Sequence, residues 1–226
     1  MIILSGASGG IAEELVDYID DKNIIGLYNK NKIKNDYKYF KKIKIDLSVE
    51  KNVKNLIYRN KKYLNNITLL LMHGYSYSSL LINDTQQNWE KTFKINVISN
   101  FNIIKYILPL MISQKWGRII FFSSITSKLG IEGTSAYSAS KSALYGLSSV
   151  ISKEYGSLNI TSNIIELGYF EKGMINDVTN SRKSKLLNQI PNKKFGKVKN
   201  IANIINAINK SEYLNKSIIK IDGAIY

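Results

Sequence analysis

The sequence predicts a single α/β domain in which helices cover both faces of a doubly wound, mostly parallel sheet. Short apolar runs alternate along the chain with longer amphipathic stretches, which is the order that βαβ units produce. A glycine-rich turn follows the first apolar run directly, as it does where a strand leads into a helix in such sheets. The 226 residues suit one domain, and no linker, repeat or low-complexity block divides residues 1–226.

The composition argues against several kinds of function. The net charge is +15, but only three of the 32 basic residues are arginine, and the lysines are scattered. Scattered lysine does not favour nucleic-acid binding, although weak attraction to acidic partners fits. No apolar run reaches the length of a membrane span and no targeting segment is recognisable, so we expect a cytoplasmic protein that does not enter membranes. Cysteine is absent and no histidine–carboxylate cluster is present, so neither thiolate catalysis nor a metal site is predicted.

The first two predicted strands are followed by candidate anion-binding residues. The run MIILS is predicted to be a buried strand, and GASGGIAEELVDYI turns tightly into a helix. Gly6, Gly9 and Gly10 would let the backbone approach a pyrophosphate. The next strand, NIIGLY, is followed by polar and cationic residues: Asn29, Lys30 and Lys32. No acid appears before Asp36, and a cation here accommodates a ribose 2′-phosphate. Between residues 31 and 42 we expect only a turn or two of helix.

The third and fourth predicted strands also end in candidate site residues. KIKIDL, residues 42–47, carries Asp46, which is either a site residue or the start signal of the amphipathic helix that runs to residue 63. ITLLLM, residues 67–72, is followed by His73 and Gly74. His73 allows acid–base chemistry, but we interpret it as a local structural residue. A long helix then begins near Asp84 or Thr85. Its predicted apolar face contains Trp89, Phe93, Val97, Phe101 and Ile104.

Residues 117–141, GRIIFFSSITSKLGIEGTSAYSASK, are the centre of the functional prediction. The apolar run before Ser123 and Ser124 indicates a buried strand that ends at these serines, where a hydroxyl can polarise a carbonyl. Tyr137 and Lys141 lie four residues apart at the start of a helix, which places both side chains on one face about 6 Å apart. Tyrosine has an ordinary pKa of about 10, and an ammonium about 5 Å away would favour the phenolate by roughly 3 kcal/mol. This pair therefore suits proton transfer near neutrality.

Other tyrosines have a lysine four residues later, and these are interpreted as solvated surface: Tyr18/Lys22, Tyr28/Lys32, Tyr37/Lys41 and Tyr58/Lys62. Only Tyr137 follows a serine at the end of an apolar strand. Beyond Lys141 the helix is predicted to continue to residue 155, and ITSNIIEL at residues 160–167 is the next strand. A polar segment at residues 174–195 is expected to close over substrate. The final helix lies within IPNKKFGKVKNIANIINAI and the final strand within SIIKIDG.

Taken together, these motifs resemble the short-chain dehydrogenase/reductase family over nearly the whole chain, nearest to the bacterial 3-oxoacyl-carrier-protein reductases. The family's catalytic serine, tyrosine and lysine correspond to Ser124, Tyr137 and Lys141, and its relay asparagine corresponds to Asn96. The resemblance implies a Rossmann-type sheet of seven strands. It also implies reduction of a ketone to a secondary alcohol by hydride transfer from a nicotinamide cofactor.

The family pattern assigns the cofactor-binding positions as well. They are Ser5, Gly6, Ser8, Gly9, Gly10, Ile11, Asn29, Lys30, Asp46, Leu47, His73, Gly74, Tyr137, Lys141 and Gly168. Three parts of the pattern differ: Asn-Asn-Ala is replaced by Leu71, Met72 and His73, a proline by Leu167, and a threonine that contacts the nicotinamide carboxamide by Lys172. These departures affect the placement of the nicotinamide.

The resemblance leaves the substrate open. The lysines after the second strand favour NADP(H), with NAD(H) as the alternative. The expected substrate is a ketone, either a small molecule or an acyl chain on a carrier protein. A sugar or sugar-nucleotide dehydrogenase in surface-glycan synthesis is one alternative, and a non-catalytic binding protein that retains the fold is another. Excess apolar surface on the helices near Gln86–Met111 and Ala136–Tyr155, which relatives use for pairing, predicts a homo-tetramer or homo-dimer.

Overall fold

The computed structural model describes residues 1–21, 23–34 and 40–226. Its sheet has seven strands in the order β3-β2-β1-β4-β5-β6-β7. The strands are β1 (Ile2–Ser5), β2 (Ile24–Tyr28), β3 (Phe40–Lys44), β4 (Thr68–Leu71), β5 (Gly117–Ser124), β6 (Ile160–Leu167) and β7 (Ile218–Ile221). Every pairing between these strands is parallel, so the predicted fold class is confirmed and the described sheet is wholly rather than mostly parallel.

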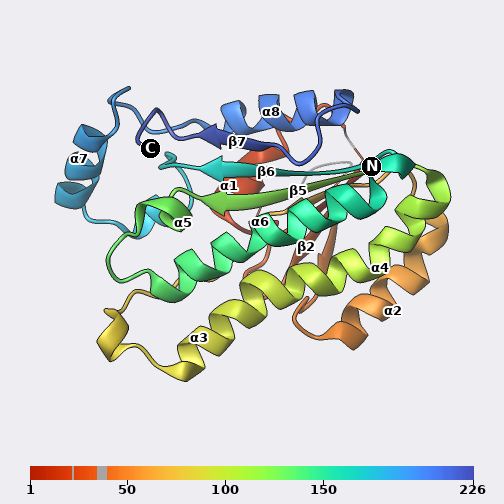
Figure 1. Ribbon diagram of the computed structural model, residues 1–226, viewed down its shortest axis with the longest axis horizontal. Coiled ribbons are helices and arrows are strands. Elements are labelled where there is room, and N and C mark those ends of the chain that lie inside the picture. The colour runs from red at the N-terminus through yellow and green to blue at the C-terminus, as the bar shows by residue number, and fades with distance from the viewer. Residues whose placement is uncertain (22, 35–39) are drawn as a thin grey trace.

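Helices cover both faces of this sheet (Figure 1). They are α1 (Gly10–Leu15), α2 (Glu50–Asn60), α3 (Gln86–Phe93), α4 (Ser99–Gln114), α5 (Thr126–Leu129), α6 (Ser135–Tyr155), α7 (Asn180–Gln189) and α8 (Val198–Lys210). One buried cluster joins the sheet to α2, α4 and α6, and a second joins it to α1 and α8. The central strands are buried on both faces, which explains why they appear in the sequence as continuous apolar runs.

The structure moves the third strand toward the amino terminus relative to the prediction. The expected strand at residues 42–47 is found at Phe40–Lys44, because its ladder pairs Ile24 through Tyr28 of β2 with residues 40–44. The expected short helix between residues 31 and 42 falls partly on residues 35–39, which lie outside the described residues. The other strands lie where the apolar runs predicted them, within a few residues.

The predicted apolar face of the long helix is wrong over most of its length. Phe101 is 47 % exposed, and Trp89, Phe93 and Val97 are partly exposed; only Ile104 of the five is buried. A π-helical segment, Lys94–Ile98, joins α3 to α4 and inserts an extra residue into the turn. As a result, several of the residues that this part of the helix buries are polar. They are Thr92, Asn96, Ser99, Asn100 and Asn102.

This helical stretch, Gln86–Gln114, is the one stretch in the described part of the chain that is long and apolar enough to cross a membrane by length and composition alone. Within the domain it packs against α2 and α6. Its buried asparagines are hydrogen-bonded, as when Asn102 Nδ2 donates to the carbonyl of Leu47 at 2.9 Å. We therefore interpret it as a core helix.

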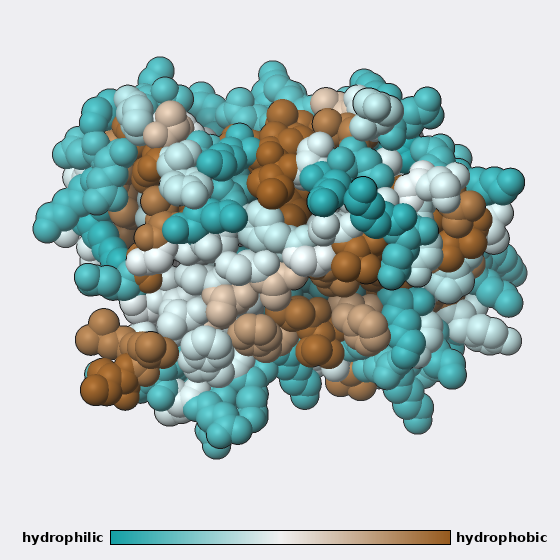
Figure 2. All heavy atoms as spheres, viewed as in Figure 1, coloured by the Kyte–Doolittle hydropathy of each residue, from teal (hydrophilic) through white to brown (hydrophobic). Residues whose placement is uncertain are grey.

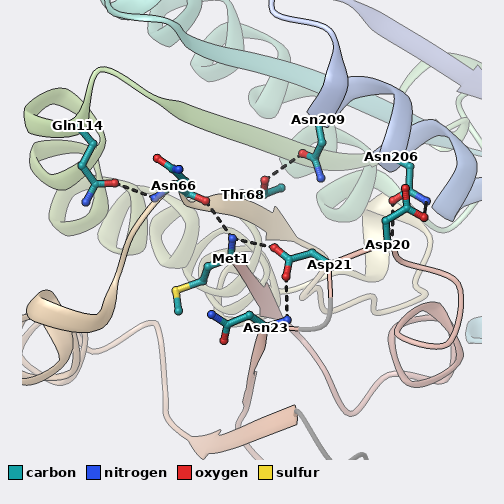
Figure 3. Close-up of polar contacts among 9 residues, drawn as sticks. All are labelled: Met1, Asp20, Asp21, Asn23, Asn66, Thr68, Gln114, Asn206 and Asn209. Carbon is teal, nitrogen blue, oxygen red and sulfur yellow. Dashed lines mark hydrogen bonds and ion pairs between the residues drawn. The ribbon is translucent and has the colours of Figure 1, made fainter.

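Polar contacts connect the helical layers to the sheet at the amino ends of its strands (Figure 3). Thr68 Oγ1 at the start of β4 donates to Asn209 Oδ1 of α8 at 2.9 Å. The backbone N–H of Asn66 donates to Gln114 Oε1 at the end of α4, also at 2.9 Å. These contacts anchor one helix from each layer at the edge opposite the carboxyl ends of the strands.

Candidate active site

Ser124, Tyr137 and Lys141 meet at the carboxyl end of β5. Ser124 is the last residue of that strand, and Tyr137 and Lys141 lie one turn apart near the start of α6. Ser124 hydrogen-bonds to the Tyr137 hydroxyl. The Lys141 ammonium lies 5.7 Å from the centre of the Tyr137 ring and donates to the carbonyl of Phe122 at 2.8 Å. The spacing in the sequence thus predicted a real spatial cluster.

The electrostatics of the cluster differ from the prediction. Burial raises the pKa of Tyr137 to about 12, and the hydrogen bond from Ser124 offsets only part of this effect. Burial also lowers the pKa of Lys141 to about 8. The expected lowering of the tyrosine pKa is therefore wrong for this site, because removing the phenolate from water outweighs the hydrogen bond with Ser124. Tyr137 therefore keeps its proton near neutral pH, as an ordinary tyrosine does.

Asn96 lies in the π segment and connects this cluster to the end of β4. It is fully buried, and its side chain pairs with the backbone of Tyr75: the Tyr75 N–H donates to Oδ1 at 2.7 Å, and Nδ2 donates to the Tyr75 carbonyl at 2.9 Å. Nδ2 also donates to Ser140 Oγ on α6 at 2.9 Å. A Cβ on Gly74 would lie 3.5 Å from Lys141 Nζ and 3.7 Å from Asn96 Oδ1. Gly74, Asn96 and Lys141 are therefore neighbours.

The glycine turn lies beside the same edge of the sheet. Gly6 has φ +69°, and a Cβ there would lie 2.7 Å from the His73 backbone, so the close approach of β1 and β4 requires glycine. A Cβ on Gly10 would lie 3.2 Å from the nitrogen of Gly173, and the Ile11 side chain contacts Gly173 from α1. The rest of the turn is formed by Ser8 and Gly9, which are partly or fully exposed. The backbone of this turn is accessible to a ligand.

His73 is partly buried at the end of β4, and its ring is hydrogen-bonded to Ser5. Its Nδ1 lies 2.7 Å from Ser5 Oγ, and Ser5 Oγ donates to the Leu70 carbonyl at 3.1 Å. Because the serine has one proton, this pattern assigns the ring proton to Nδ1. Nε2 lacks a well-formed hydrogen bond among the described residues, and only a weak backbone interaction with Ile95 favours the charged ring. Burial, together with the charge on Lys141, lowers the pKa of His73 to about 3, so the ring is neutral.

The ends of β2 and β3 bring Asn29 and Asp46 together. Asp46 Oδ1 accepts from the N–H of Ser48 at 2.9 Å and from its hydroxyl at 2.7 Å, and the Asn29 side chain adds a third hydrogen bond. Burial acts to raise the pKa of Asp46, but these hydrogen bonds outweigh it and the pKa is lowered. The N-cap of α2 is Val49, so Asp46 orders the preceding turn rather than capping the helix. Leu47 is buried beside it, and the side chain of Lys30 is exposed.

The segment after β6 lies against α1. A Cβ on Gly168 would lie 2.6 Å from the Cα of Asp222, which explains glycine at this position. Lys172, at the position of the family's threonine, has its Nζ 3.7 Å from Glu14 Oε2 on α1. The expected polar segment at residues 174–195 contains helix α7. No cluster of metal-ligating side chains occurs among residues 1–21, 23–34 and 40–226.

Sequence reasoning missed a group of polar side chains behind Ser124. Tyr145 of α6 donates to Glu166 Oε2 on β6 and lies 3.0 Å from Ser127 Oγ of α5. Ser127 Oγ donates to the Ser124 carbonyl at 2.7 Å. The available signal was Glu166 itself, an acid within the otherwise apolar end of a strand predicted to be buried.

A parallel sheet with a glycine turn after β1 and a serine–tyrosine–lysine cluster at the carboxyl ends of its strands defines an α/β dinucleotide-binding protein with a proton-transfer site. The family profile described as short chain dehydrogenase matches residues 1–183. The chain belongs to this family and is an NAD(P)-dependent oxidoreductase.

Individual relatives agree with this assignment. The 3-oxoacyl-[acyl-carrier-protein] reductase FabG of Buchnera aphidicola subsp. Schizaphis graminum is 28 % identical over 99 % of this chain and 96 % of its own length. The protein of the same name from Staphylococcus epidermidis strain RP62A is 32 % identical over 68 % of this chain and 64 % of its own length. A crystal structure of a protein provisionally assigned as a gluconate dehydrogenase from Agrobacterium tumefaciens superposes with a TM-score of 0.90 at 19 % identity, covering 100 % of this chain and 95 % of that one. This last similarity concerns the fold.

The described residues fit a nicotinamide dinucleotide. Gly74 leaves space beside Lys141 and Asn96 that a Cβ would fill, and the backbone of the glycine turn is accessible. Asp46 is held by hydrogen bonds two residues after the end of β3, near the same edge. These groups lie along one edge of the sheet, as an extended ligand requires.

Proposed function

We propose that the protein is an NADPH-dependent reductase that converts a ketone into a secondary alcohol, acting as one domain of residues 1–226. The observation that carries this proposal is the cluster of Ser124, Tyr137 and Lys141 at the carboxyl end of β5. The 3-oxoacyl-carrier-protein reductases among its relatives support a 3-oxoacyl group on a carrier protein as the substrate. A cytoplasmic location follows from this proposed role.

Each residue of the cluster has a distinct task. Ser124 hydrogen-bonds to the carbonyl oxygen of the ketone, and Tyr137 donates its proton to that oxygen. The bound nicotinamide supplies the hydride. The Tyr137 hydroxyl keeps its proton at neutral pH, and the hydrogen bond with Ser124 keeps the hydroxyl directed at the substrate. Lys141 places its charge beside the tyrosine and the cofactor ribose, and Asn96 supports the relay that returns a proton to it.

The lysines that follow β2 favour NADPH over NADH. Lys30 and Lys32 are exposed, and no carboxylate occurs between Tyr28 and residue 34 to bind a ribose 2′-hydroxyl. A partly screened phosphate contact of this kind contributes roughly 1.5–3 kcal/mol. NAD(H) remains the alternative cofactor.

We also propose that the protein assembles into a homo-tetramer or homo-dimer through α4 and α6. Ile98 and Phe101 near the start of α4 are 46 % and 47 % exposed, and Val150 on α6 is 52 % exposed. Figure 2 shows apolar side chains gathered along this helical face. The exposed side of the long helix therefore supports the assembly that its apolar content suggested.

The decisive experiment compares Tyr137→Phe with the wild type and with Tyr155→Phe, a control with the same chemical change at the far end of α6. We expect Tyr137→Phe to reduce turnover by at least about a hundredfold, because it removes the proton donor and keeps the ring. NADPH binding, followed by energy transfer from protein fluorescence, should stay within about twofold in both variants. Substantial turnover by Tyr137→Phe would contradict the assignment.

A substrate panel then separates the enzymatic alternatives. It contains a 3-oxoacyl chain on a carrier protein, the same chain on a small thiol, and oxidised sugars and sugar nucleotides. Preference for the carrier-bound chain supports the proposal, and preference for a sugar supports the glycan alternative. NADPH binding without reduction of any member would identify a binding protein that retains the fold.

A further inference from the structure

Glu166 is an unusual residue for the position it occupies. It lies near the end of β6, where it pairs across the sheet with Ser123, the residue before Ser124. Its side chain is fully buried, with an exposure of 0 %. Oε2 accepts a hydrogen bond from Tyr145, and Oε1 has no hydrogen-bond partner among the described residues. No lysine or arginine forms an ion pair with it within the described part of the chain.

A buried carboxylic acid without a neighbouring cation does not by itself stabilise a folded protein. Taking a carboxylate out of water is expensive unless cations or several hydrogen bonds compensate, and apolar replacements of similar volume often stabilise a protein. Residues that break local rules in this way tend to occur at functional sites. Glu166 lies at the carboxyl end of a strand beside β5, next to the proposed catalytic cluster.

A series of short polar contacts leads from Glu166 to the backbone of Ser124. Tyr145 donates to Glu166 and lies 3.0 Å from Ser127 Oγ. Ser127 Oγ donates to the Ser124 carbonyl at 2.7 Å, and Ser142 Oγ donates to the Ser127 carbonyl at 3.2 Å. The series therefore joins β6, α6 and the short helix α5 that begins two residues after Ser124.

The same turn sets the direction of the Ser124 hydroxyl. Ser124 Oγ accepts from the N–H of Thr126 at 3.3 Å and hydrogen-bonds to Tyr137. The helix α5 has only four residues, which is too short to hold a fixed geometry by its own hydrogen bonds. Contacts from its neighbours must fix it, and α6 supplies two that reach Ser127: the Tyr145 hydroxyl lies against its side chain, and the Ser142 hydroxyl donates to its carbonyl.

We propose that Tyr145 and Glu166 are positioning residues, which hold the turn at Ser124–Leu129 so that the Ser124 hydroxyl stays directed at Tyr137 and the substrate carbonyl. Glu166 fixes the Tyr145 hydroxyl, and Tyr145 fixes Ser127. Neither residue contacts the substrate. The effect on turnover rests on the proposed reductase function, whereas the effect on the order of the turn at Ser124–Leu129 does not.

The experiment uses the full chain, four single variants, and a double variant that combines Tyr145→Phe with Glu166→Leu. Tyr145→Phe removes the hydroxyl, Glu166→Leu removes its acceptor, and Glu166→Gln keeps an acceptor oxygen. Tyr155→Phe is the matched control, because it makes the same change on α6 outside the series. We expect kcat to fall about tenfold in Tyr145→Phe and in Glu166→Leu, with KM for NADPH within about twofold of wild type. Glu166→Gln should restore most of the wild-type rate, and Tyr155→Phe should leave it unchanged.

Amide hydrogen exchange of the peptide that covers residues 124–129 gives a readout that needs no substrate. Exchange should be at least about tenfold faster in Tyr145→Phe and in Glu166→Leu than in wild type, and unchanged in Tyr155→Phe. The double variant should resemble either single one, because both break the same series. Unchanged exchange in Tyr145→Phe would overturn the inference. So would equal kinetic losses in Glu166→Gln and Glu166→Leu. If wild type reduces no ketone but the exchange pattern holds, the proposed function fails and the positioning series stands.

Discussion

Lowering the pH from 7 to 5 should destabilise the protein through one side chain, His73. It is the only histidine in the chain, and burial together with the charge on Lys141 lowers its pKa to about 3. In the unfolded chain the pKa returns to about 6.5. The unfolded state therefore binds more protons between these two values. The free energy of unfolding is highest above the unfolded pKa and falls as the pH drops toward the folded one.

The size of the effect follows from the two pKa values. Relative to pH 7, the proton linkage gives a loss of about 2 kcal/mol at pH 5 and roughly 3 kcal/mol at pH 4. Most carboxylates titrate below pH 5. The interval from pH 7 to pH 5 therefore isolates the histidine from the acidic groups.

Urea unfolding at a fixed protein concentration, in steps of about half a pH unit, measures this directly. The control is His73→Asn, whose short amide can keep the contact with Ser5 but cannot take up a proton in this range. We expect the variant to be less stable at pH 7, because it leaves a small cavity, but to lose less than about 0.5 kcal/mol between pH 7 and pH 5. A flat wild-type curve, or an equal loss in the variant, would refute the reasoning about buried His73.

Three further outcomes are expected. Reductase turnover should decline above a pH of about 8, because Lys141 loses its charge as the pH rises through its lowered pKa. Lys141→Ala should weaken NADPH binding, and its residual rate should no longer show this decline. An unchanged pH profile in the variant would contradict the assignment. Dissociation constants for NADPH and NADH should differ by at least about tenfold, and the difference should shrink in a Lys30→Ala, Lys32→Ala double variant and at high salt; equal binding by the wild type would remove the preference for NADP(H). Light scattering at micromolar concentration should give a multiple of the 25.7 kDa monomer mass, and Phe101→Glu should lower it; a monomeric wild type would refute the assembly through α4.

Much of the fold could be predicted because the central strands are buried on both faces. β1 and β4 appear in the sequence as short apolar runs, and β5 and β6 contain apolar runs at Ile119–Phe122 and Ile164–Ile165, which locate these strands to within a few residues. The cluster of Ser124, Tyr137 and Lys141 could also be predicted, because a strand end and one helical turn determine where those side chains lie. In both cases the order and spacing of residues within a short stretch of the chain are enough to predict the structure.

Other features depend on surroundings that spacing does not encode. The raised pKa of Tyr137 comes from burial by the rest of the domain, which outweighs the hydrogen bond with Ser124. The series from Glu166 through Tyr145 joins side chains that are 21 and 18 residues apart in the sequence and lie on three different elements. The exposed position of Phe101 follows from the backbone of the π segment rather than from hydropathy.

The π segment at Lys94–Ile98 also determines which changes in chain length this helix can tolerate. Loss of a single residue there would allow an ordinary α-helix to form, and one α-helical residue corresponds to about 100° of rotation. Because the wide turn absorbs its extra residue, α3 and α4 would keep their phase while the residues of the segment itself shift, and the Asn96 amide would leave the backbone of Tyr75. A deletion that leaves the composition and hydropathy of the helix almost unchanged would thus separate the end of β4 from α6. Substitutions on the outer face of α4 would leave that connection intact.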